Sequence, residues 1–250
     1  MWSRDELDRY ARQMVLPELG PRGQARLKQA SVLVVGAGGL GAPLLLYLAA
    51  AGVGRLGIVD SDRVELSNLQ RQILYRAQDL GRLKVEAARE ALLALNPLIS
   101  IEPYPERLLA PRAAELVGAY DVVVDASDNF PTRYLLNQAC AERDRPLVYG
   151  AVYRFEGQVA LFRPRQGPCY ACLYPEPPSE GPNCAEAGVL GAVVGVVGSW
   201  MAVEVLKLLS GVGAPIWDRL ILYDGLGATV HTLQLNRRPG CPVCSSAVLD

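Results

Sequence analysis

The segment Val32-Leu-Val-Val-Gly-Ala-Gly-Gly-Leu-Gly41 decides the fold of this chain. Its apolar first half predicts a buried strand, and its glycines predict a tight turn that opens into a helix at Gly41. Gly36 permits the sharp turn, Gly38 and its neighbour Gly39 let backbone amides approach phosphate oxygens, and Gly41 lets helix and strand pack closely. The helix N-terminus adds partial positive charge. The order strand, glycines, helix favours a nucleotide site over a turn that serves the fold alone.

Composition and charge exclude several classes of protein. With 250 residues and 50% hydrophobic composition, the chain can bury a large core. Its 25 basic and 26 acidic residues give a net charge of −1, which predicts no general attraction to nucleic acid or to anionic membranes. The charged N-terminal stretch lacks the apolar run of a signal peptide, which predicts a cytoplasmic protein.

Strand and helix patterns alternate along the chain. Residues 3–27 predict two short helices, broken at Pro17 and at residues 20–23, which either pack on the domain or cross to a second subunit. After the glycine turn, a helix over residues 42–51 and a strand over residues 55–60 complete a βαβ unit. Further helices are predicted over residues 84–95, 112–117 and 131–142, and further strands over residues 99–104 and 121–125.

The C-terminal half changes its pattern. Strand-like runs over residues 147–152, 157–162, 220–223 and 229–234 predict antiparallel additions to a parallel sheet, and so a Rossmann-like mixed α/β fold. The nearly uncharged residues 187–203 are shorter than the roughly 20 residues of a membrane span, and Glu204 and Lys207 continue the same helix. A buried core helix is predicted, with Gly191, Gly195 and Gly198 allowing close backbone approach.

Polar side chains follow the ends of the predicted strands, where open α/β sheets bind ligands. Asp60 is placed to accept a hydrogen bond from a ribose hydroxyl, and a solvated loop carboxylate is the alternative. Arg71 could hold phosphates through two hydrogen bonds, and Lys84 begins another helix. Either cation alone would be interpreted as a surface charge. Asp128 offers the oxygen ligand that magnesium prefers, and a helix N-cap is its alternative.

The six cysteines fall into three groups. Cys169 with Cys172 and Cys241 with Cys244 form two loop pairs, each with the gap that lets two thiolates reach one tetrahedral zinc. A redox dithiol is the alternative, although neither pair lies at the strand-to-helix junction of a thioredoxin-like motif. Cys140 fits the apolar side of its helix. Cys184 precedes a helix start, an environment that lowers the pKa of a thiol.

Three motifs together resemble one enzyme family. They are the glycine turn, Asp60-Ser-Asp-Arg-Val-Glu-Leu-Ser-Asn-Leu-Gln-Arg-Gln72 and Gly81-Arg-Leu-Lys84. The chain is similar to the adenylyltransferases that activate ubiquitin-like sulfur carriers for molybdopterin, thiamine or tRNA-thiolation pathways, which are bacterial relatives of ubiquitin-activating enzymes. The likeness runs from Arg9-Tyr-Ala-Arg-Gln13 to the cysteine pair that ends at Cys244.

The resemblance implies a single adenylation domain over residues 1–250, with N-terminal helices (1–30), a nucleotide-binding part (31–165) and a carrier-docking and zinc part (166–250). It implies ATP with magnesium at Asp128, a structural zinc on the four paired cysteines, and a homodimer in which Arg12 reaches the partner's nucleotide. Cys184 matches an active-site cysteine that not every member uses. The implied catalytic residues are Arg12, Arg71, Lys84, Asp128 and Cys184, and the implied nucleotide-binding residues are Gly36, Gly38, Gly39, Gly41, Asp60, Asp62, Asn68, Arg71, Gln72, Lys84, Asp128 and Asn129.

The implied partners are a carrier protein ending in Gly-Gly and a separate sulfur donor, such as a cysteine desulfurase or sulfurtransferase, because no sulfurtransferase domain follows Cys244. Two other functions use the same nucleotide fingerprint. A nicotinamide-dependent oxidoreductase would need an acid or base beside the reacting carbon, and no histidine or Tyr-x-x-x-Lys pair occurs in a suitable loop. A nucleotide-sensing scaffold with a zinc knuckle would bind ATP without exchanging pyrophosphate.

Overall fold

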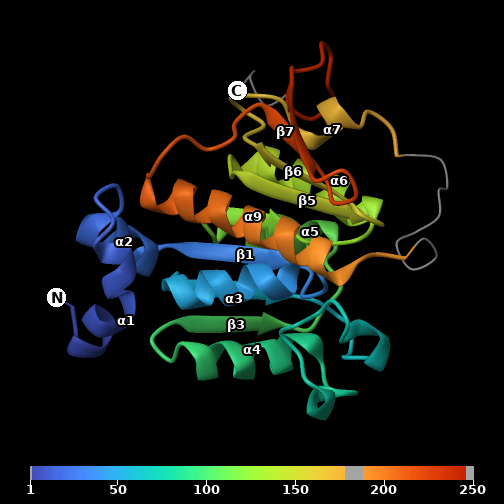
Figure 1. The fold of residues 1–250 in the computed structure, drawn as a ribbon. Coiled ribbons are helices and arrows are strands. Elements are labelled where there is room, and N and C mark those ends of the chain that lie inside the picture. The colour runs from blue at the N-terminus through green and yellow to red at the C-terminus, as the bar shows by residue number, and fades with distance from the viewer. Residues whose placement is uncertain (1, 178–187, 246–250) are drawn as a thin grey trace.

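The computed structural model describes residues 2–177 and 188–245. Its centre is an eight-stranded sheet in the order β3-β2-β1-β4-β5-β6-β7-β8 (Figure 1). The strands from β3 to β5 pair in parallel, and β5 to β8 pair antiparallel, which confirms the predicted mixed sheet. The strands are β1 (Ser31–Val35), β2 (Arg55–Val59), β3 (Ser100–Tyr104), β4 (Val122–Asp125), β5 (Leu147–Tyr153), β6 (Glu156–Phe162), β7 (Arg219–Asp224) and β8 (Thr229–Gln234).

Helices cover both faces of the sheet. They are α1 (Arg4–Met14), α2 (Gly20–Gln29), α3 (Gly41–Ala51), α4 (Lys84–Leu95), α5 (Ala110–Gly118), α6 (Phe130–Arg143), α7 (Tyr170–Leu173) and α9 (Gly191–Ser210), with 3₁₀ turns at Leu66–Asn68 and Ala77–Asp79. Alternate residues of β1 enter two cores: Val32 and Val34 join side chains of α3, α4 and α9, whereas Leu33 and Val35 join side chains of α5 and α6. Burial on both faces explains the continuous apolar run of this strand.

The N-terminal helices pack on the domain itself. Gln13 and Gln24 both donate hydrogen bonds to the carbonyl oxygen of Ala51, at 3.1 and 2.8 Å. The predicted break at residues 20–23 is wrong, because α2 begins at Gly20 and Pro21 lies in its first turn, where proline needs no N–H partner. The break between the helices covers residues 15–19 only.

The helix α9 begins later and ends later than the pattern predicted. Leu190 is its N-cap, and it continues to Ser210. Among the described residues it is the one helix long and apolar enough to cross a membrane by length and composition, with 44% of its most apolar window buried. It lies along α3, β5 and β6, so it is a core helix. One of its sides is exposed, as the 51% exposure of Val203 shows. A Cβ at Gly198 would lie 2.6 Å from the carbonyl oxygen of Leu40, whereas Gly195 meets no such neighbour, so its predicted close approach is wrong.

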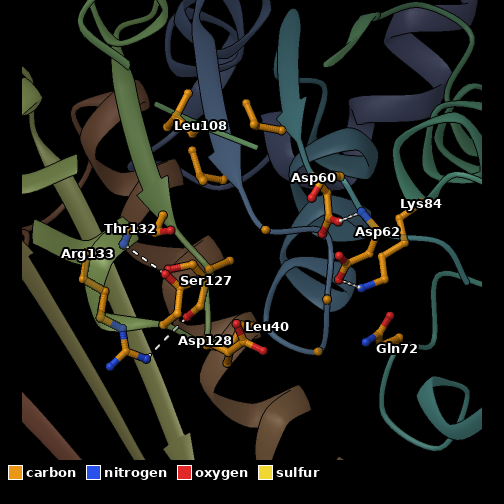
Figure 2. A pocket seen from close by; sticks show the side chains of 18 of the residues that line it. Leu40, Asp60, Asp62, Gln72, Lys84, Leu108, Ser127, Asp128, Thr132 and Arg133 are labelled. Carbon is orange, nitrogen blue, oxygen red and sulfur yellow. Dashed lines mark hydrogen bonds and ion pairs between the residues drawn. The ribbon is translucent and has the colours of Figure 1, made fainter. Parts of the chain in front are cut away.

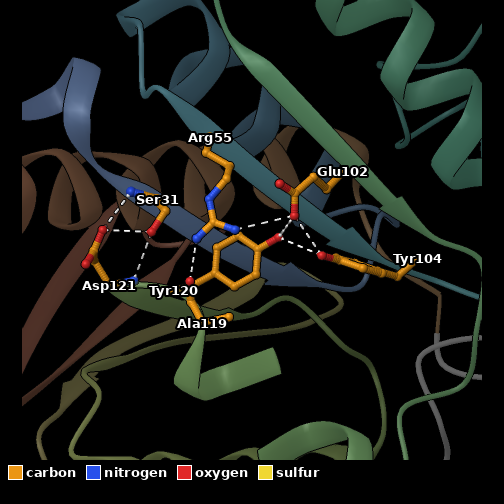
Figure 3. A network of polar contacts seen from close by, with 7 residues as sticks. All are labelled: Ser31, Arg55, Glu102, Tyr104, Ala119, Tyr120 and Asp121. Atoms are coloured by element: carbon orange, nitrogen blue, oxygen red, sulfur yellow. Dashed lines mark hydrogen bonds and ion pairs between the residues drawn. The ribbon is translucent and has the colours of Figure 1, made fainter. Parts of the chain in front are cut away.

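A polar network of Arg55, Glu102, Tyr104 and Tyr120 ties β2, β3 and the segment before β4 together (Figure 3). Glu102 accepts hydrogen bonds from the hydroxyls of Tyr104 and Tyr120, both at 2.7 Å, and pairs with Arg55 at 3.4 Å. The guanidinium of Arg55 also lies 4.2 Å from the ring centre of Tyr120. None of these four side chains lines the cavity described next, so the network supports the fold.

Candidate active site

A cavity of about 380 Å³ opens at the carboxyl ends of β1, β2 and β4 (Figure 2). Most of the residues predicted to bind the nucleotide line it, although they come from separate turns and loops. They are Gly36, Gly38, Gly39, Asp60, Asp62, Arg71, Gln72, Lys84, Asp128 and Asn129. The position agrees with the rule that open α/β sheets bind ligands at this edge.

The glycines of the turn have different roles. Gly36 has a φ of +99°, and a Cβ there would lie 2.6 Å from the carbonyl oxygen of Ala126, so no larger residue fits. A Cβ on Gly41 would overlap the carbonyl oxygen of Gly36, which is the predicted close packing of helix and strand. Gly38 is open except for the Gln72 side chain at 3.7 Å, whereas Gly39 packs against Val194 of α9. Among the glycines of the turn, Gly38 therefore leaves room at the cavity for a ligand to approach.

Asp60 connects the glycine turn to the loop after β2. Its two carboxylate oxygens accept hydrogen bonds from the N–H groups of Ala37 and Asp62, each at 2.8 Å (Figure 2). Burial raises the pKa of Asp60, and the nearby Lys84 charge opposes this shift. The carboxylate lines the cavity and keeps free lone pairs, so a bond to a ribose hydroxyl stays compatible with its position.

Lys84 is not the solvated helix residue that the pattern alone allows. It is 6% exposed, and its ammonium pairs at 2.8 Å with Asp62, whose side chain is 66% exposed (Figure 2). Arg71 donates to the carbonyl oxygen of Ser67 at 3.0 Å and also lines the cavity. The buried Oε1 of Gln72 has no hydrogen-bond partner among the described residues. Cationic and donor groups therefore gather beside Gly38.

Asn68 does not line the cavity. It is 8% exposed, and its Oδ1 accepts a hydrogen bond from the N–H of Glu65 at 3.3 Å, which caps the 3₁₀ turn that carries this loop. In the structure its contacts shape the loop before Arg71. Its predicted nucleotide contact stays a prediction.

The turn between β4 and α6 presents Asp128 to the cavity. The N-cap of α6 is Asn129, whose Oδ1 accepts from the N–H of Thr132 at 3.0 Å, so the capping alternative for Asp128 is wrong. The buried Asp125 stabilises this turn, because its Oδ1 accepts hydrogen bonds from both the N–H and the hydroxyl of Ser127. The exposed Asp128 carboxylate forms no hydrogen bond or ion pair recorded within residues 2–177 and 188–245.

Several lining residues were not predicted. Glu106, Arg107 and Leu108 follow β3, and the rule of strand ends applied to this third strand would have found them. Arg133 lies in the first turn of α6, is 9% exposed, and donates to the carbonyl oxygen of Ser127 at 3.4 Å. Its guanidinium lies 5.4 Å from the ring centre of Tyr149, a contact from another strand that no local pattern signals. The others are Val35 and Val59 at the ends of β1 and β2, and Leu40, Ser61, Ala126, Ser127, Thr132, Ala151, Val152, Val189 and Val194.

The predicted catalytic residue Arg12 does not lie at the cavity of its own chain. Arg12 is exposed on α1, at the opposite end of the strands from the cavity (Figure 1), and does not line it. One chain alone therefore does not bring Arg12 to its own cavity. Cys184 falls within residues 178–187, outside the described residues.

The four paired cysteines meet, as predicted. Their sulfur atoms all lie within 4.8 Å of one another, with separations of 3.9 Å (Cys169 to Cys172), 3.7 Å (Cys169 to Cys241) and 3.4 Å (Cys172 to Cys244). Thiolates 2.3 Å from a tetrahedral zinc lie about 3.8 Å apart, so the cluster has the size of such a site. Of the first pair, Cys169 ends a loop as the N-cap of the one-turn helix α7, whereas Cys172 lies within this helix and not in a loop as expected. Cys140 is buried apart from them, and burial raises the pKa of its thiol.

Known proteins resemble this chain over nearly its whole length. It is 57% identical to the sulfur carrier protein adenylyltransferase of Thermus thermophilus, covering 97% of this chain and 92% of that protein. It is 50% identical to the SAMP-activating enzyme E1 of Haloferax volcanii (98% and 91% covered), and 52% identical to the mouse adenylyltransferase and sulfurtransferase MOCS3, of which it spans about half (97% and 53%).

The fold has solved counterparts. The crystal structure of E. coli MccB with ATP matches with a TM-score of 0.80 at 24% identity, covering 90% of this chain and 69% of that one. The family model described as the ThiF family matches residues 10–243. From this match and the identities above, the chain belongs to the ThiF family.

Proposed function

We propose that this chain adenylates the C-terminal glycine carboxylate of a ubiquitin-like sulfur carrier with ATP, and so prepares it for thiocarboxylate formation. The observation that carries the proposal is the gathering of Arg71, Lys84 and Asp128 around an accessible Gly38, in a chain whose relatives are named as enzymes that activate sulfur carriers. Molybdopterin, thiamine and tRNA-thiolation pathways are the proposed settings, in the cytoplasm.

The chemistry requires positioning more than proton transfer. A C-terminal carboxylate has a pKa of about 3.5 and is ionised at neutral pH, so it attacks the α-phosphorus without a general base. The carboxylate oxygen forms the new bond to phosphorus, the bond from phosphorus to the bridging oxygen breaks, and pyrophosphate leaves. Arg71 and Lys84 would neutralise the charge that spreads over the phosphates, and the cavity would hold the reacting atoms in line.

The proposed metals have separate roles. Asp128 would hold magnesium, which supplies charge neutralisation at the phosphates when it is bound. The four paired cysteines would hold zinc, and because thiolates fill all four positions, this site would be structural. The same part of the chain, residues 166–250, is also proposed to dock the carrier.

Two further elements of the proposal lie outside one chain. Arg12 on the surface of α1 would reach the nucleotide of a second copy in a homodimer, which agrees with its distance from its own cavity. Sulfur would come from a separate donor, with Cys184 as a covalent or disulfide-linked way station. In the covalent route the Cys184 thiolate displaces AMP from the acyl adenylate to form a thioester, and sulfide from the donor then displaces this thiolate to give the thiocarboxylate. In the disulfide-linked route a donor persulfide displaces AMP, Cys184 displaces the donor's thiolate from the acyl disulfide, and a second thiol reduces the carrier–Cys184 disulfide to release the thiocarboxylate.

The relatives give no support to the oxidoreductase alternative. His231 lies on the exposed strand β8 and not among the residues that line the cavity. The chain therefore offers no histidine there for hydride chemistry.

ATP–pyrophosphate exchange tests the proposal and separates it from a nucleotide-sensing scaffold. Candidate carriers ending in Gly-Gly are added to the protein with ATP, magnesium and labelled pyrophosphate, and exchange is expected only with the correct carrier. A carrier whose last glycine is amidated is the matched control, because it keeps the fold and loses the attacking carboxylate. ATP binding without exchange with any Gly-Gly carrier would contradict the proposal.

A further inference from the structure

The helix α6 contacts both the cavity and the four-cysteine site. At its beginning, Asn129, Thr132 and Arg133 line the cavity. Asn137 follows Arg133 by four residues, so the two side chains lie on the same side of the helix, about 6 Å apart at their Cβ atoms. The two sites are therefore one helical turn apart.

Asn137 uses both ends of its carboxamide on the cysteine side. The residue is fully buried, its Nδ2 lies 3.6 Å from Sγ of Cys169, and its Oδ1 accepts a hydrogen bond from the N–H of Tyr170 at 2.9 Å. An N–H donor to a metal-bound thiolate forms a charge-assisted hydrogen bond, which is stronger than one to a neutral thiol. The contact of Asn137 with this loop therefore depends on the state of the cysteines.

A second contact runs through aromatic rings. Tyr170, next to Cys169, has its ring centre 5.2 Å from that of Tyr149, and Tyr149 lies 5.4 Å from the guanidinium of Arg133. Arg133 in turn donates to the carbonyl oxygen of Ser127, the residue before Asp128. A shift of the loop at Cys169 would thus reach the Asp128 turn by two routes, the helix and the tilted, contacting rings.

We propose that Asn137 is a positioning residue that couples the four-cysteine metal site to the nucleotide cavity. It fixes α6 on the metal-bound loop, and α6 holds Arg133 and the Asp128 turn in place. This inference rests on the proposed function for the nucleotide and for the metal. Because both ligands would favour the same position of α6, each site is expected to bind its ligand more tightly when the other is occupied, and the two effects must be equal in size.

The test measures zinc affinity by competition with a chelating dye, with and without saturating MgATP. Magnesium is kept in excess so that the nucleotide does not itself take the zinc. For the wild-type protein, MgATP is expected to raise zinc affinity about 5-fold or more, within the usual range of such couplings. For Asn137→Ala, zinc affinity is expected to fall about 10-fold or more, as for other outer contacts of metal ligands, and the effect of MgATP is expected to disappear.

Asn96→Ala is the matched control. Asn96 is also fully buried, and its Nδ2 donates to the Tyr10 hydroxyl at 2.8 Å and the Ala49 carbonyl oxygen at 2.7 Å, away from both sites. This variant is expected to unfold at a lower temperature and to keep the full effect of MgATP. If Asn137→Ala does not fold, Asn137→Asp keeps the acceptor for Tyr170, removes the donor to Cys169 and adds a negative charge beside the thiolates. Its zinc affinity is therefore expected to fall in any case, and the loss of the MgATP effect is the deciding result.

The outcomes separate the two proposals. Absence of MgATP binding to the wild-type protein would contradict the proposed function. Wild-type binding of MgATP with an unchanged zinc affinity would overturn the coupling and leave the proposed function standing. An Asn137 variant that keeps the full effect of MgATP would overturn the role of Asn137.

Discussion

Replacing Lys84 by methionine should separate activity from stability. The ammonium of Lys84 is 6% exposed and its only described ion-pair partner, Asp62, is mostly exposed. The Met side chain fills nearly the same space, removes the cost of burying a charge, and leaves Asp62 to be solvated by water. Against this, the buried Asp60 loses the nearby positive charge that favours its ionised form, so the two effects oppose each other. The free energy of unfolding is therefore expected to change by less than about 1 kcal/mol.

The loss of activity should be large. Two unit charges 4 Å apart interact by about 4 kcal/mol at an effective dielectric constant of about 20, and water is partly excluded around Lys84. Loss of one such donor to a developing charge typically lowers the rate about 10²–10³-fold. We expect a decrease of this size in carrier-dependent ATP–pyrophosphate exchange by Lys84→Met.

Lys207→Met provides the opposite case. Lys207 is 23% exposed and pairs at 2.8 Å with Glu204, which is 2% exposed and also accepts from the N–H of Ile216. Removing this lysine leaves a buried carboxylate with one remaining donor. The free energy of unfolding is therefore expected to fall by about 2 kcal/mol, and the rate of ATP–pyrophosphate exchange is expected to stay unchanged. Exchange by Lys84→Met within 3-fold of wild type, with both variants folded by circular dichroism, would refute the role of Lys84.

Three further predictions concern Asp128, Arg12 and Glu102. Asp128→Asn is expected to raise the magnesium concentration needed for half-maximal exchange about 10-fold or more, and an unchanged magnesium dependence would remove Asp128 from the metal site. Arg12→Ala and Lys84→Ala subunits, each inactive alone, are expected to recover one working site per mixed dimer, and verified heterodimers without exchange would place the whole site in one chain. Burial acts to raise the pKa of Glu102, but the hydrogen bonds from Tyr120 and Tyr104 outweigh it, and the pKa is lowered. Glu102 therefore stabilises the fold above its unfolded pKa of about 4.3, and this contribution is lost as the pH falls through the lower folded value. Tyr120→Phe should therefore flatten the acid limb of the stability profile measured by thermal unfolding, and an acid limb as steep as wild type would count against the network.

The glycine turn could be predicted because everything it needs is local. A strand, a turn with positive φ and a helix follow one another within residues 32–51, and the requirements at Gly36 and Gly41 come from neighbouring backbone. The two-residue gap inside each cysteine pair is equally local. Their meeting is not, since Cys169 and Cys241 are 72 positions apart, and the family resemblance supplied that step.

The burial of Lys84 could not be predicted from its position. As the first residue of α4 it has the pattern of a solvated charge, and it becomes buried because the loop after β2 folds over it. The N–H of Lys84 donates to the carbonyl oxygen of Asp62, and Arg63 pairs with Leu83, so the loop is held there by contacts over about 20 residues. Arg133 was missed for the same reason, because Tyr149 lies on a different strand.

The charges that line the cavity also explain why Asp128 differs from its neighbours. Asp60 accepts two backbone N–H groups, Asp62 pairs with Lys84, and Glu106 pairs with Arg112, so these carboxylates have protein partners. Asp128 has none recorded among the described residues, yet it faces a cavity whose cations suit a polyanion. A carboxylate and a triphosphate repel each other unless a cation lies between them, and a hard divalent cation binds both through oxygen. Under the proposed function, the unpartnered Asp128 would therefore oppose phosphate binding in the absence of magnesium and act as a ligand in its presence, which would make nucleotide binding depend on the metal.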